Sequence, residues 1–456
     1  MTEELEVLYE KLAFNFENRK FADLRILMLD TEPADIASFM EENLETPEQI
    51  KFFRLLPKEL ASDVFIEIDS DIQEELIRAF TDKELKAVID DMFLDDTVDV
   101  IEEMPANVVK RILKNSSAEN RKQINELLEY PDDSAGSIMT TEYVSFSQNM
   151  TVEMAFDKIR RTGVNKETVY TCYVTNSKKQ LLGVVTVKDL LFADKSELVG
   201  DVMDTNVITV ETLEDKEEVA NKLSKYDFLA LPVVDKEGCL VGIVTVDDAV
   251  DVITEEATED IQKMAAITPN EKPYLKQGVF GIFLARAPWL LILMFSATFT
   301  SLILSSFEAK LNIASTLLYA FIPMITGTAG NAGGQTAVSV IRAISLGEAE
   351  FRDLWRVVWK ELRVSLLLGL TVALACFGKL MLIDRLYNDI TLDIALLISG
   401  VLFLTIVMSK FIGCILPLVA KKIKLDPAVV ASPFMTTIVD ALALIIYCVV
   451  AIAVLV

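Results

Sequence analysis

The hydrophobic residues of this chain are distributed very unevenly, and they gather beyond residue 286. Five stretches there are each long enough to cross a bilayer, which takes about 20 apolar residues per helix. They lie near residues 287–305, 313–341, 364–381, 394–420 and 428–456. Five such stretches cannot all find a soluble interior. The pattern therefore predicts a transmembrane domain of five helices over residues 271–456.

Residues 1–130 show instead the pattern of short amphipathic helices. Leu-Pro and Met-Pro breaks recur, as in "RLLPKELASDVFIEID" and "DMFLDDTVDVIEEMP". Capping-box signatures at Thr46, Thr81 and Ser116 mark expected helix starts. We expect an all-α N domain in which short helix pairs wind into a superhelix.

Residues 131–250 contain an internal duplication. "GSIMTTEYVSFSQNMTVEMAFDKI" is similar to "GDVMDTNVITVETLEDKEEVANKL", and "LLGVVTVKDLL" is similar to "LVGIVTVDDAV". Each copy reads strand, helix, strand, strand, helix, which is the α/β pattern of a CBS-domain pair, a regulatory module. Residues 251–270 are predicted to form a connecting helix into the membrane domain.

Each copy of the duplication carries the motif G-h-h-T-x-x-D, where h is an apolar residue. In the first copy this motif places Thr186 and Asp189 at the start of a helix. In CBS modules such a pair often contacts the ribose or phosphate of a nucleotide, so the two residues are candidate nucleotide ligands. The alternative is that Thr and Asp only cap the helix.

The two parts of the chain differ in charge. Residues 271–456 hold 15 Lys and Arg against 11 Asp and Glu, whereas residues 1–270 hold 28 against 58, a net charge of −30. This acidic excess argues against nucleic acid as a partner, because phosphates need basic side chains. It suits solvation or the binding of cations.

Lys and Arg also predict an orientation. They are frequent before the first predicted span, between the second and third, and between the fourth and fifth, and sparse in the other loops. By the positive-inside rule, the N-terminus is cytoplasmic and the C-terminus lies outside. The N-terminal residues lack the pattern of a signal peptide. We therefore expect a multi-pass protein of the plasma membrane whose soluble part is cytoplasmic.

Ionisable residues are rare inside the predicted spans. Asp440 stands in the middle of "TTIVDALALI" in the fifth span, and Lys410 stands within the fourth. A charge at such depth costs roughly 2.5–3.5 kcal/mol on insertion scales. We interpret Asp440 as a cation site. The structural alternative is a partner such as Lys410, or a protonated carboxyl.

The second predicted span carries a glycine-dense polar segment, "GTAGNAGGQTA". Asn331 is its candidate pore ligand, and Gln335 lies four residues later on the same helix face. The alternative is a tight packing seam between helices.

Composition limits the ligand chemistry of such a pore. The chain has no His and only five scattered Cys, so oxygen ligands remain. Oxygen-only sites favour hard cations, Mg²⁺ and Ca²⁺ before Zn²⁺ or Cu²⁺. Two copies of Asp440 in a two-fold dimer would supply a charge of −2, which matches a divalent ion.

Acidic residues crowd the connecting helix and the segments expected to face it. Between Asp247 and Asp260 there are seven acids and no base, and bound cations would relieve their mutual repulsion. A solvated charged face is the alternative. The candidate regulatory ligands for a cation are Asp95, Asp215, Glu217, Asp227, Asp248, Asp251, Glu256, Glu259 and Asp260.

With these features in place, the whole chain resembles the MgtE family of magnesium channels and transporters. The resemblance rests on the order of the segments and on "GTAGNAGGQTA", "ATEDIQKM" and the Asp of "VDALALIIY". It implies a homodimeric, Mg²⁺-selective pore lined by Asp440, which closes when cytosolic Mg²⁺ bridges the acidic domains. It also implies that ATP is a candidate ligand of the CBS pair, since some members bind it.

The sequence therefore predicts a multidomain membrane protein that is not an enzyme. Its expected function is a Mg²⁺-selective channel or transporter gated by cytosolic Mg²⁺. The ATPase motif GxxxxGK[ST] is missing from the sequence, so a primary pump is not expected. Two rivals remain: an ion-coupled exporter of divalent cations, and a membrane-anchored CBS protein that senses nucleotides.

Overall fold

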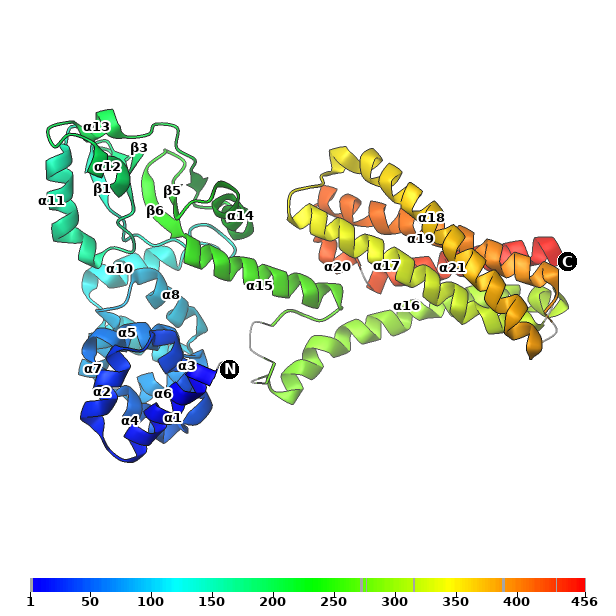
Figure 1. The fold of residues 1–456 in the computed structure, drawn as a ribbon, viewed down its shortest axis with the longest axis horizontal. Helices are drawn as coiled ribbons and strands as arrows, with labels where there is room; N and C mark the ends of the chain where they lie inside the picture. The colour runs from blue at the N-terminus through cyan, green and yellow to red at the C-terminus, as the bar shows by residue number, and fades with distance from the viewer. Residues whose placement is uncertain are drawn as a thin grey trace. The chain divides into compact units, whose positions relative to one another are not determined.

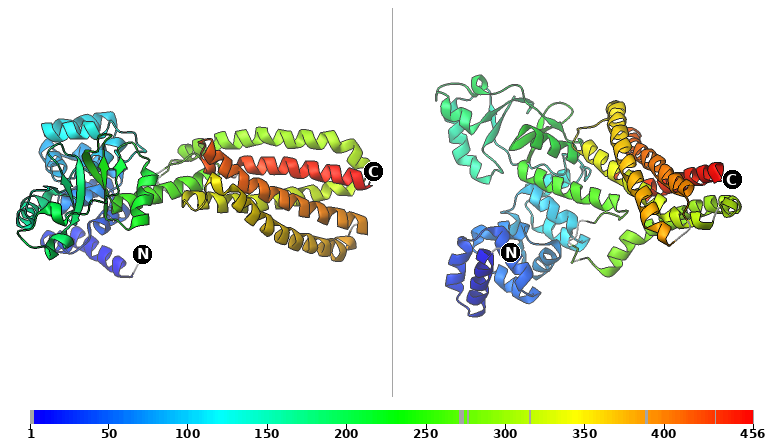
Figure 2. Two further views of the ribbon diagram at one scale, coloured as in Figure 1. Left: turned by 90° about the horizontal axis from the view of Figure 1, so that it is seen from above. Right: turned by 45° about the vertical axis from the view of Figure 1, so that its right-hand side comes forward.

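The computed structural model describes residues 3–270, 274–275, 277–314, 316–387, 390–431 and 433–455. The chain divides into two compact units, Met1–Ile253 and Thr254–Val456. Figures 1 and 2 show the elements of each unit. Each unit has its own hydrophobic core.

Ten helices make up the N-terminal part of the first unit (Figure 1). Their bounds are α1 (Glu3–Glu17), α2 (Phe21–Leu29), α3 (Pro33–Asn43), α4 (Thr46–Phe53), α5 (Lys58–Ile66), α6 (Ser70–Ala79), α7 (Asp82–Ile89), α8 (Leu94–Glu103), α9 (Ala106–Asn115) and α10 (Ala118–Leu127). Their apolar faces bury Phe39, Phe52 and Phe65 almost completely. The predicted all-α N domain is confirmed.

The expected helix starts are right at one position of three. Thr81 and Glu84 form a complete capping box at α7. Thr46 is instead already helical, and Glu45 occupies the N-cap of α4. At α10 the cap is Ser117, one residue later than expected, because the hydroxyl of Ser116 bonds back to the carbonyl of Ile112.

The predicted CBS pair forms two three-stranded sheets of identical topology. The first contains β1 (Ser145–Ser147), β2 (Thr171–Thr175) and β3 (Leu181–Thr186), and the second contains β4 (Val210–Glu211), β5 (Ala230–Val234) and β6 (Leu240–Thr245). In each, the first two strands pair in parallel and the last two antiparallel. The central strand of each sheet carries a register shift at the same place, between Val174 and Thr175 and between Val233 and Val234.

Helices complete each copy in the predicted order. Their bounds are α11 (Val152–Thr162), η1 (Gly163–Asn165), α12 (Val187–Phe192), α13 (Val199–Val202), α14 (Lys216–Tyr226) and α15 (Val246–Met264). The glycine of each G-h-h-T-x-x-D motif packs against backbone. A Cβ on Gly183 would lie 2.7 Å from the carbonyl of Asp204, and one on Gly242 would lie 2.8 Å from that of Thr140. Both positions therefore require glycine for the same steric reason.

The second unit is a bundle of long helices (Figure 2). Its elements are α16 (Val279–Ala314), η2 (Thr316–Phe321), α17 (Ile322–Ser345), η3 (Phe351–Asp353), α18 (Leu354–Leu382), η4 (Asp384–Leu386), α19 (Leu392–Lys422), α20 (Pro427–Ala431) and α21 (Pro433–Leu455). The most deeply buried of them is α19, which packs against α17, α18 and α21. In the described part, α16, α18, α19 and α21 are long and apolar enough to span a membrane.

The second expected span corresponds to α17, with a different start. The apolar pattern placed it at residues 313–341, whereas the helix runs from Ile322 to Ser345 after a short 3-10 turn. The glycines and polar residues of α17 lower its hydropathy, which explains why it is not among the four helices that are long and apolar enough to span a membrane.

Helices α17 and α19 cross in direct backbone contact. A Cβ on Gly413 of α19 would lie 2.5 Å from the carbonyl oxygen of Gly333 on α17. A Cβ on Gly333 would in turn lie 3.1 Å from the carbonyl oxygen of Ser409. This crossing fixes the position of α17, because small residues let membrane helices approach closely.

Gly413→Ala should therefore separate α17 from α19. We expect a loss of about 1–3 kcal/mol of stability, as for other overpacked sites. Thermal unfolding of the purified protein in detergent measures it. Gly400→Ala is the matched control on the same helix, because nothing lies within 4 Å of a Cβ there. Equal melting temperatures for the two variants would contradict the close crossing.

Candidate cation sites

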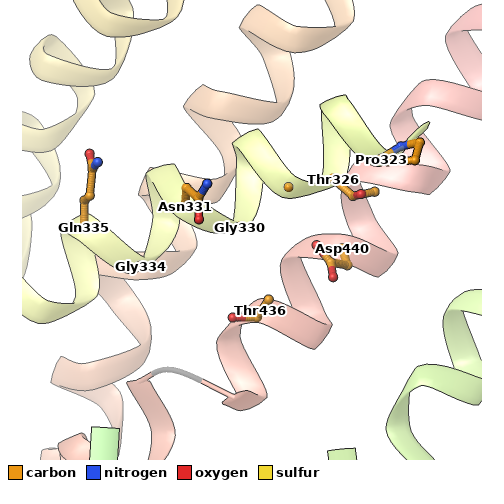
Figure 3. Close-up of a pocket in the computed structure, with 9 residues that line it drawn as sticks. Pro323, Thr326, Gly330, Asn331, Gly334, Gln335, Thr436 and Asp440 are labelled. Carbon is orange, nitrogen blue, oxygen red and sulfur yellow. The ribbon is translucent and has the colours of Figure 1, made fainter. Parts of the chain in front are cut away.

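A cavity of about 500 Å³ lies between α17 and α21. Its lining combines glycines with neutral oxygen donors and one carboxylate (Figure 3). The lining residues are Pro323, Thr326, Gly327, Gly330, Asn331, Gly334, Gln335, Thr436 and Asp440. Asp440 and Asn331, the two residues predicted from the sequence as pore ligands, thus line the same cavity.

The helical spacing of α17 explains why one of its faces lines the cavity and the other is buried. Positions three and four residues apart share a face, and the cavity residues Gly327, Gly330, Asn331 and Gly334 follow this spacing. Ala329, Gly333 and Thr336 are buried. Because α17 is helical throughout, its carbonyls are engaged along the helix, and side-chain oxygens dominate the ligand set.

Asp440 faces the glycine-rich part of α17. Its Oδ1 would lie 3.7 Å from a Cβ placed on Gly330, so the glycine leaves room beside the carboxylate. Figure 3 shows Asp440 and Thr436 on α21 opposite this part of α17, while Gln335 points away from α21. Among the described residues, no hydrogen bond or ion pair neutralises Asp440. Such a half-buried carboxylate is a candidate cation ligand.

The alternative partner of Asp440 is engaged elsewhere. Lys410 donates to the hydroxyl of Thr336 at 2.9 Å and pairs with Glu361 at 3.5 Å. An ion pair between Lys410 and Asp440 is therefore wrong for this structure. Glu361 could not be predicted as the partner of Lys410, because the two residues are 49 positions apart and lie on different helices.

A second group of carboxylates lies in the first unit, between α8 and the start of α15. The predicted residues Asp95 and Asp248 belong to it and influence each other electrostatically. Asp96, Glu142 and Glu167 join them. One carboxylate oxygen each of Asp95 and Glu142 is buried and has no hydrogen-bond partner in the described part of the chain. The group therefore carries concentrated, incompletely satisfied negative charge.

Burial, reinforced by neighbouring carboxylates, raises the pKa of these acids. The pKa of Asp95 rises to about 6, that of Asp96 to about 8, and those of Glu167 and Asp248 to about 7. Each shift means that the negative form is disfavoured where the group stands. A bound cation would reverse this effect by favouring ionised carboxylates.

The other predicted regulatory acids do not join this group in one site. Asp215 caps the start of α14 and accepts from the backbone of Glu217, whereas Asp227 ends the same helix in a left-handed conformation. The helix between them is about 16 Å long. Asp251 lies on α15, where burial and Asp247 raise its pKa. In the described residues, no three acidic or Cys side chains are arranged to hold a metal ion.

The last turns of α15 are tied to other elements of the second unit. Lys263 forms ion pairs of 2.7 Å with both Glu259 and Asp426, and Asp260 accepts from Ser345 at 3.3 Å. Burial and Asp426 raise the pKa of Asp260. Asp426 also caps α20 through the backbone of Ala428. Sequence reasoning missed Asp426 and Lys263, although the Asp-Pro pair after the fourth span signalled a cap. Glu256 lies on the same helix and stays a prediction.

The nucleotide motif forms a helix cap. Thr186 accepts from the backbone of Asp189 at 3.1 Å, and Asp189 accepts from the backbone of Thr186 at 3.0 Å. In the second copy the hydroxyl of Thr245 donates to the carboxylate of Asp248 at 2.7 Å. The capping alternative is thus realised, and nucleotide binding stays a prediction.

Long apolar helices around an oxygen-lined cavity, joined to an acidic CBS module, define a membrane protein that transports cations. Comparison with known proteins agrees. The family model for MgtE divalent cation transporters matches residues 322–450, that of the MgtE intracellular N domain matches residues 31–133, and that of the CBS domain matches residues 135–196 and 199–255.

Full-length relatives extend this match over nearly the whole chain. The magnesium transporter MgtE of Thermus thermophilus is 36% identical and that of Bacillus subtilis 33%, covering 93% and 94% of this chain and 93% of each relative. The chain therefore belongs to the MgtE family. This is a family of transporters, so the expectation that the protein is not an enzyme is confirmed.

Solved structures match the soluble part. The soluble part of a magnesium transporter aligns with a TM-score of 0.52 at 31% identity, covering 56% of this chain and 99% of that one. The cytosolic domain of the Mg²⁺ channel MgtE in complex with ATP aligns with a TM-score of 0.51 at 33% identity, covering 54% and 99%. These structures support the helical N domain and the CBS pair.

The raised pKa values predict how stability depends on pH. Free carboxyls have a pKa near 4. Between about pH 4 and pH 8 these four carboxyls therefore bind more protons in the folded protein than in the unfolded chain. Their contribution to stability is present at low pH and is lost as pH rises through about 6 to 8. Calorimetry of the full chain in EDTA should show the transition of the first unit lower at pH 8 than at pH 6, by roughly 5 °C.

Asp96→Asn combined with Asp248→Asn should flatten this dependence, because two of the titrating groups are removed. Asp157→Asn is the matched control, since Asp157 is exposed on α11. A transition at the same temperature at both pH values in the unaltered protein would contradict the shifts.

Proposed function

We propose that the protein is a Mg²⁺-selective, homodimeric channel whose ion path runs between α17 and α21 and whose gate responds to cytosolic Mg²⁺. The observation that carries this proposal is the cavity, with its Asp440 carboxylate lacking any described partner and its other polar lining residues neutral oxygen donors. Such a set suits a hard divalent cation. The relatives that match nearly the whole chain are named magnesium transporters.

A second copy of the chain would complete the path. Asn331, Gln335 and Gly327 are exposed on the cavity side of one chain, so the cavity is open there. Two-fold association is the commonest way for a chain to close such a surface. It would bring two Asp440 carboxylates to one axis, with a charge that matches Mg²⁺. Mg²⁺ keeps several of its waters and is usually held by one or two carboxylates.

Movement of Mg²⁺ through this path would be passive. Each charge that moves inward gains about 2.3 kcal/mol per 100 mV of membrane potential, so a divalent ion gains about 4.6 kcal/mol. We place the N-terminus in the cytoplasm of the cell and the C-terminus outside, in the plasma membrane, from the distribution of Lys and Arg.

Cytosolic Mg²⁺ would act on the acidic residues. In the first unit it would neutralise the carboxylate group around Asp95 and Asp248. In the second it would compete with Lys263 for Glu259, Asp260 and Asp426, which tie α15 to the ends of α17 and α20. Ion binding that favours one arrangement of α15 suffices for gating, because the coupling requires only different affinities in two states.

ATP is a second candidate ligand of the CBS pair. A related cytosolic domain was solved with ATP, and the cap of Thr186 and Asp189 ends the strand where such modules receive nucleotides. Among the rival functions, an ion-coupled exporter is favoured by one observation. A membrane carboxylate that has no partner among the described residues, such as Asp440, can also carry a proton.

Asp440→Asn should reduce Mg²⁺ flux by at least about 100-fold, because it removes the charge that compensates a desolvated cation. Uptake of Mg²⁺ into liposomes that contain the purified protein measures this. The matched control is Asp393→Asn, since Asp393 is exposed at the start of α19. Normal flux in Asp440→Asn would refute the proposed path.

Glu259→Gln combined with Asp260→Asn should weaken inhibition by Mg²⁺ on the cytoplasmic side. We expect the half-inhibiting concentration to rise about tenfold, which corresponds to about 1.4 kcal/mol of coupling. Flux assays at graded Mg²⁺ concentrations on that side test it. Glu126→Gln, an exposed acid on α10, serves as the control. Unchanged inhibition in the double variant would remove the end of α15 from the sensor.

A further inference from the structure

A buried lysine lies directly behind the cavity-lining helix α17. Lys410 on α19 is 4% exposed, and no other Lys, Arg, Asp or Glu of the described residues is as deeply buried. Its ammonium donates to the hydroxyl of Thr336 at 2.9 Å and lies 3.5 Å from the carboxylate of Glu361 on α18. Thr336 donates to the same carboxylate oxygen at 3.1 Å. One charged group of three residues thus joins α17, α18 and α19.

The charged group lies close to the cavity without touching it. Thr336 directly follows the cavity residue Gln335, but its side chain is buried against α19. The backbone contact of Gly413 with Gly333 holds α19 against α17 at this level. A helix is about 10 Å across, so Lys410 and Glu361 lie roughly one helix thickness from an ion in the cavity.

Charges at such a distance act strongly when water and salt do not screen them. Exposed charges farther apart than about 10 Å are largely screened at ordinary salt, whereas buried charges are screened much less. A lone ammonium behind α17 would repel a divalent cation in the cavity, and a lone carboxylate there would attract it. In the structure the two charges oppose each other, and Thr336 bonds to both.

We propose that Lys410 and Glu361 form a balanced charge pair that sets the affinity of the cavity for divalent cations by acting through α17. They are positioning residues, since neither contacts the ion. The proposal rests on the ion path between α17 and α21 described above. If the pair were only a structural cross-link, removing either partner would have no preferred direction of effect on the affinity for divalent cations. If the pair is a balance of charges, removing Lys410 and removing Glu361 should change that affinity in opposite directions.

The test measures Mg²⁺ uptake into proteoliposomes against Mg²⁺ concentration. Glu361→Gln leaves the ammonium unbalanced and should raise the half-saturating concentration about tenfold, and Lys410→Met should lower it by a similar factor. The combined variant removes both charges and should return the value to within about twofold of the unaltered protein. Lys379→Met is the matched control, because Lys379 is exposed and pairs with Asp384 at the opposite end of α18 from Glu361, so its removal should not change the value.

The proposal would be overturned if the half-saturating Mg²⁺ concentration shifted in the same direction in the two single variants. It would also be overturned if that concentration departed further from normal in the combined variant than in either single variant. Either result would leave only a structural cross-link. Removing one partner of a buried pair can also prevent folding, whereas removing both is often tolerated. A single variant that cannot be purified is therefore replaced by the comparison of the other single variant with the combined one. If neither single variant can be purified, the combined variant decides. A normal half-saturating Mg²⁺ concentration in the combined variant supports the balanced pair, and the absence of Mg²⁺ flux in it overturns the proposal.

Asp440→Asn in the same assay separates this proposal from the proposed function. Normal flux in that variant means that the path itself is wrong. Flux that Asp440→Asn abolishes, together with shifts of equal sign for Lys410 and Glu361, rejects the balanced pair alone.

Discussion

An ionised side chain inside a membrane must be paired or must serve a function, and the second unit is organised by this constraint. Lys410 meets it within the chain, through Glu361 and the hydroxyl of Thr336. Asp440 has no such described partner and faces a cavity lined by glycines and neutral oxygens. The contrast separates a charge that is paired within the chain from a candidate cation ligand. It also places both charges around α17, which presents one face to the cavity and the other to α19.

Burying ionised side chains is also costly in the first unit, where several carboxylates lie close together. Asp95, Asp96 and Asp248 share a partly buried region whose pKa values lie well above those of free carboxyls. The raised pKa values mean that the protonated form of these acids is favoured there, and a bound cation would favour the ionised form. At the end of α15 the negative charges of Glu259 and Asp426 are instead balanced by Lys263, which forms an ion pair with each of them. A cation that replaced the ammonium there would compete with an existing tie between helices.

Much of this organisation was predictable, because it depends on local periodicity. Apolar length indicated the membrane helices, the duplicated segments indicated two sheets of one topology, and isolation in an apolar run indicated Asp440. Helical spacing also placed Asn331 on its face of α17. Contacts between distant positions were not predictable. Nothing local links Glu361 to Lys410, or Lys263 to Asp426. The cap at Ser117 was missed because the hydroxyl of Ser116 bonds to the carbonyl of Ile112 instead. The starts of α4 and α17 were also missed, and neither helix has a side-chain cap that would mark its first residue.

Passive, selective passage of Mg²⁺ through the membrane unit is the property that we propose for this protein. The most direct measurement is Mg²⁺ uptake into proteoliposomes whose membrane potential is fixed by a K⁺ gradient, with and without gradients of protons and Na⁺. For a passive channel we expect uptake that rises with an inside-negative potential and is the same whether or not those gradients are present. Uptake that requires a proton or Na⁺ gradient would contradict a channel and indicate an ion-coupled exchanger. Absence of uptake at every potential would contradict transport through this path.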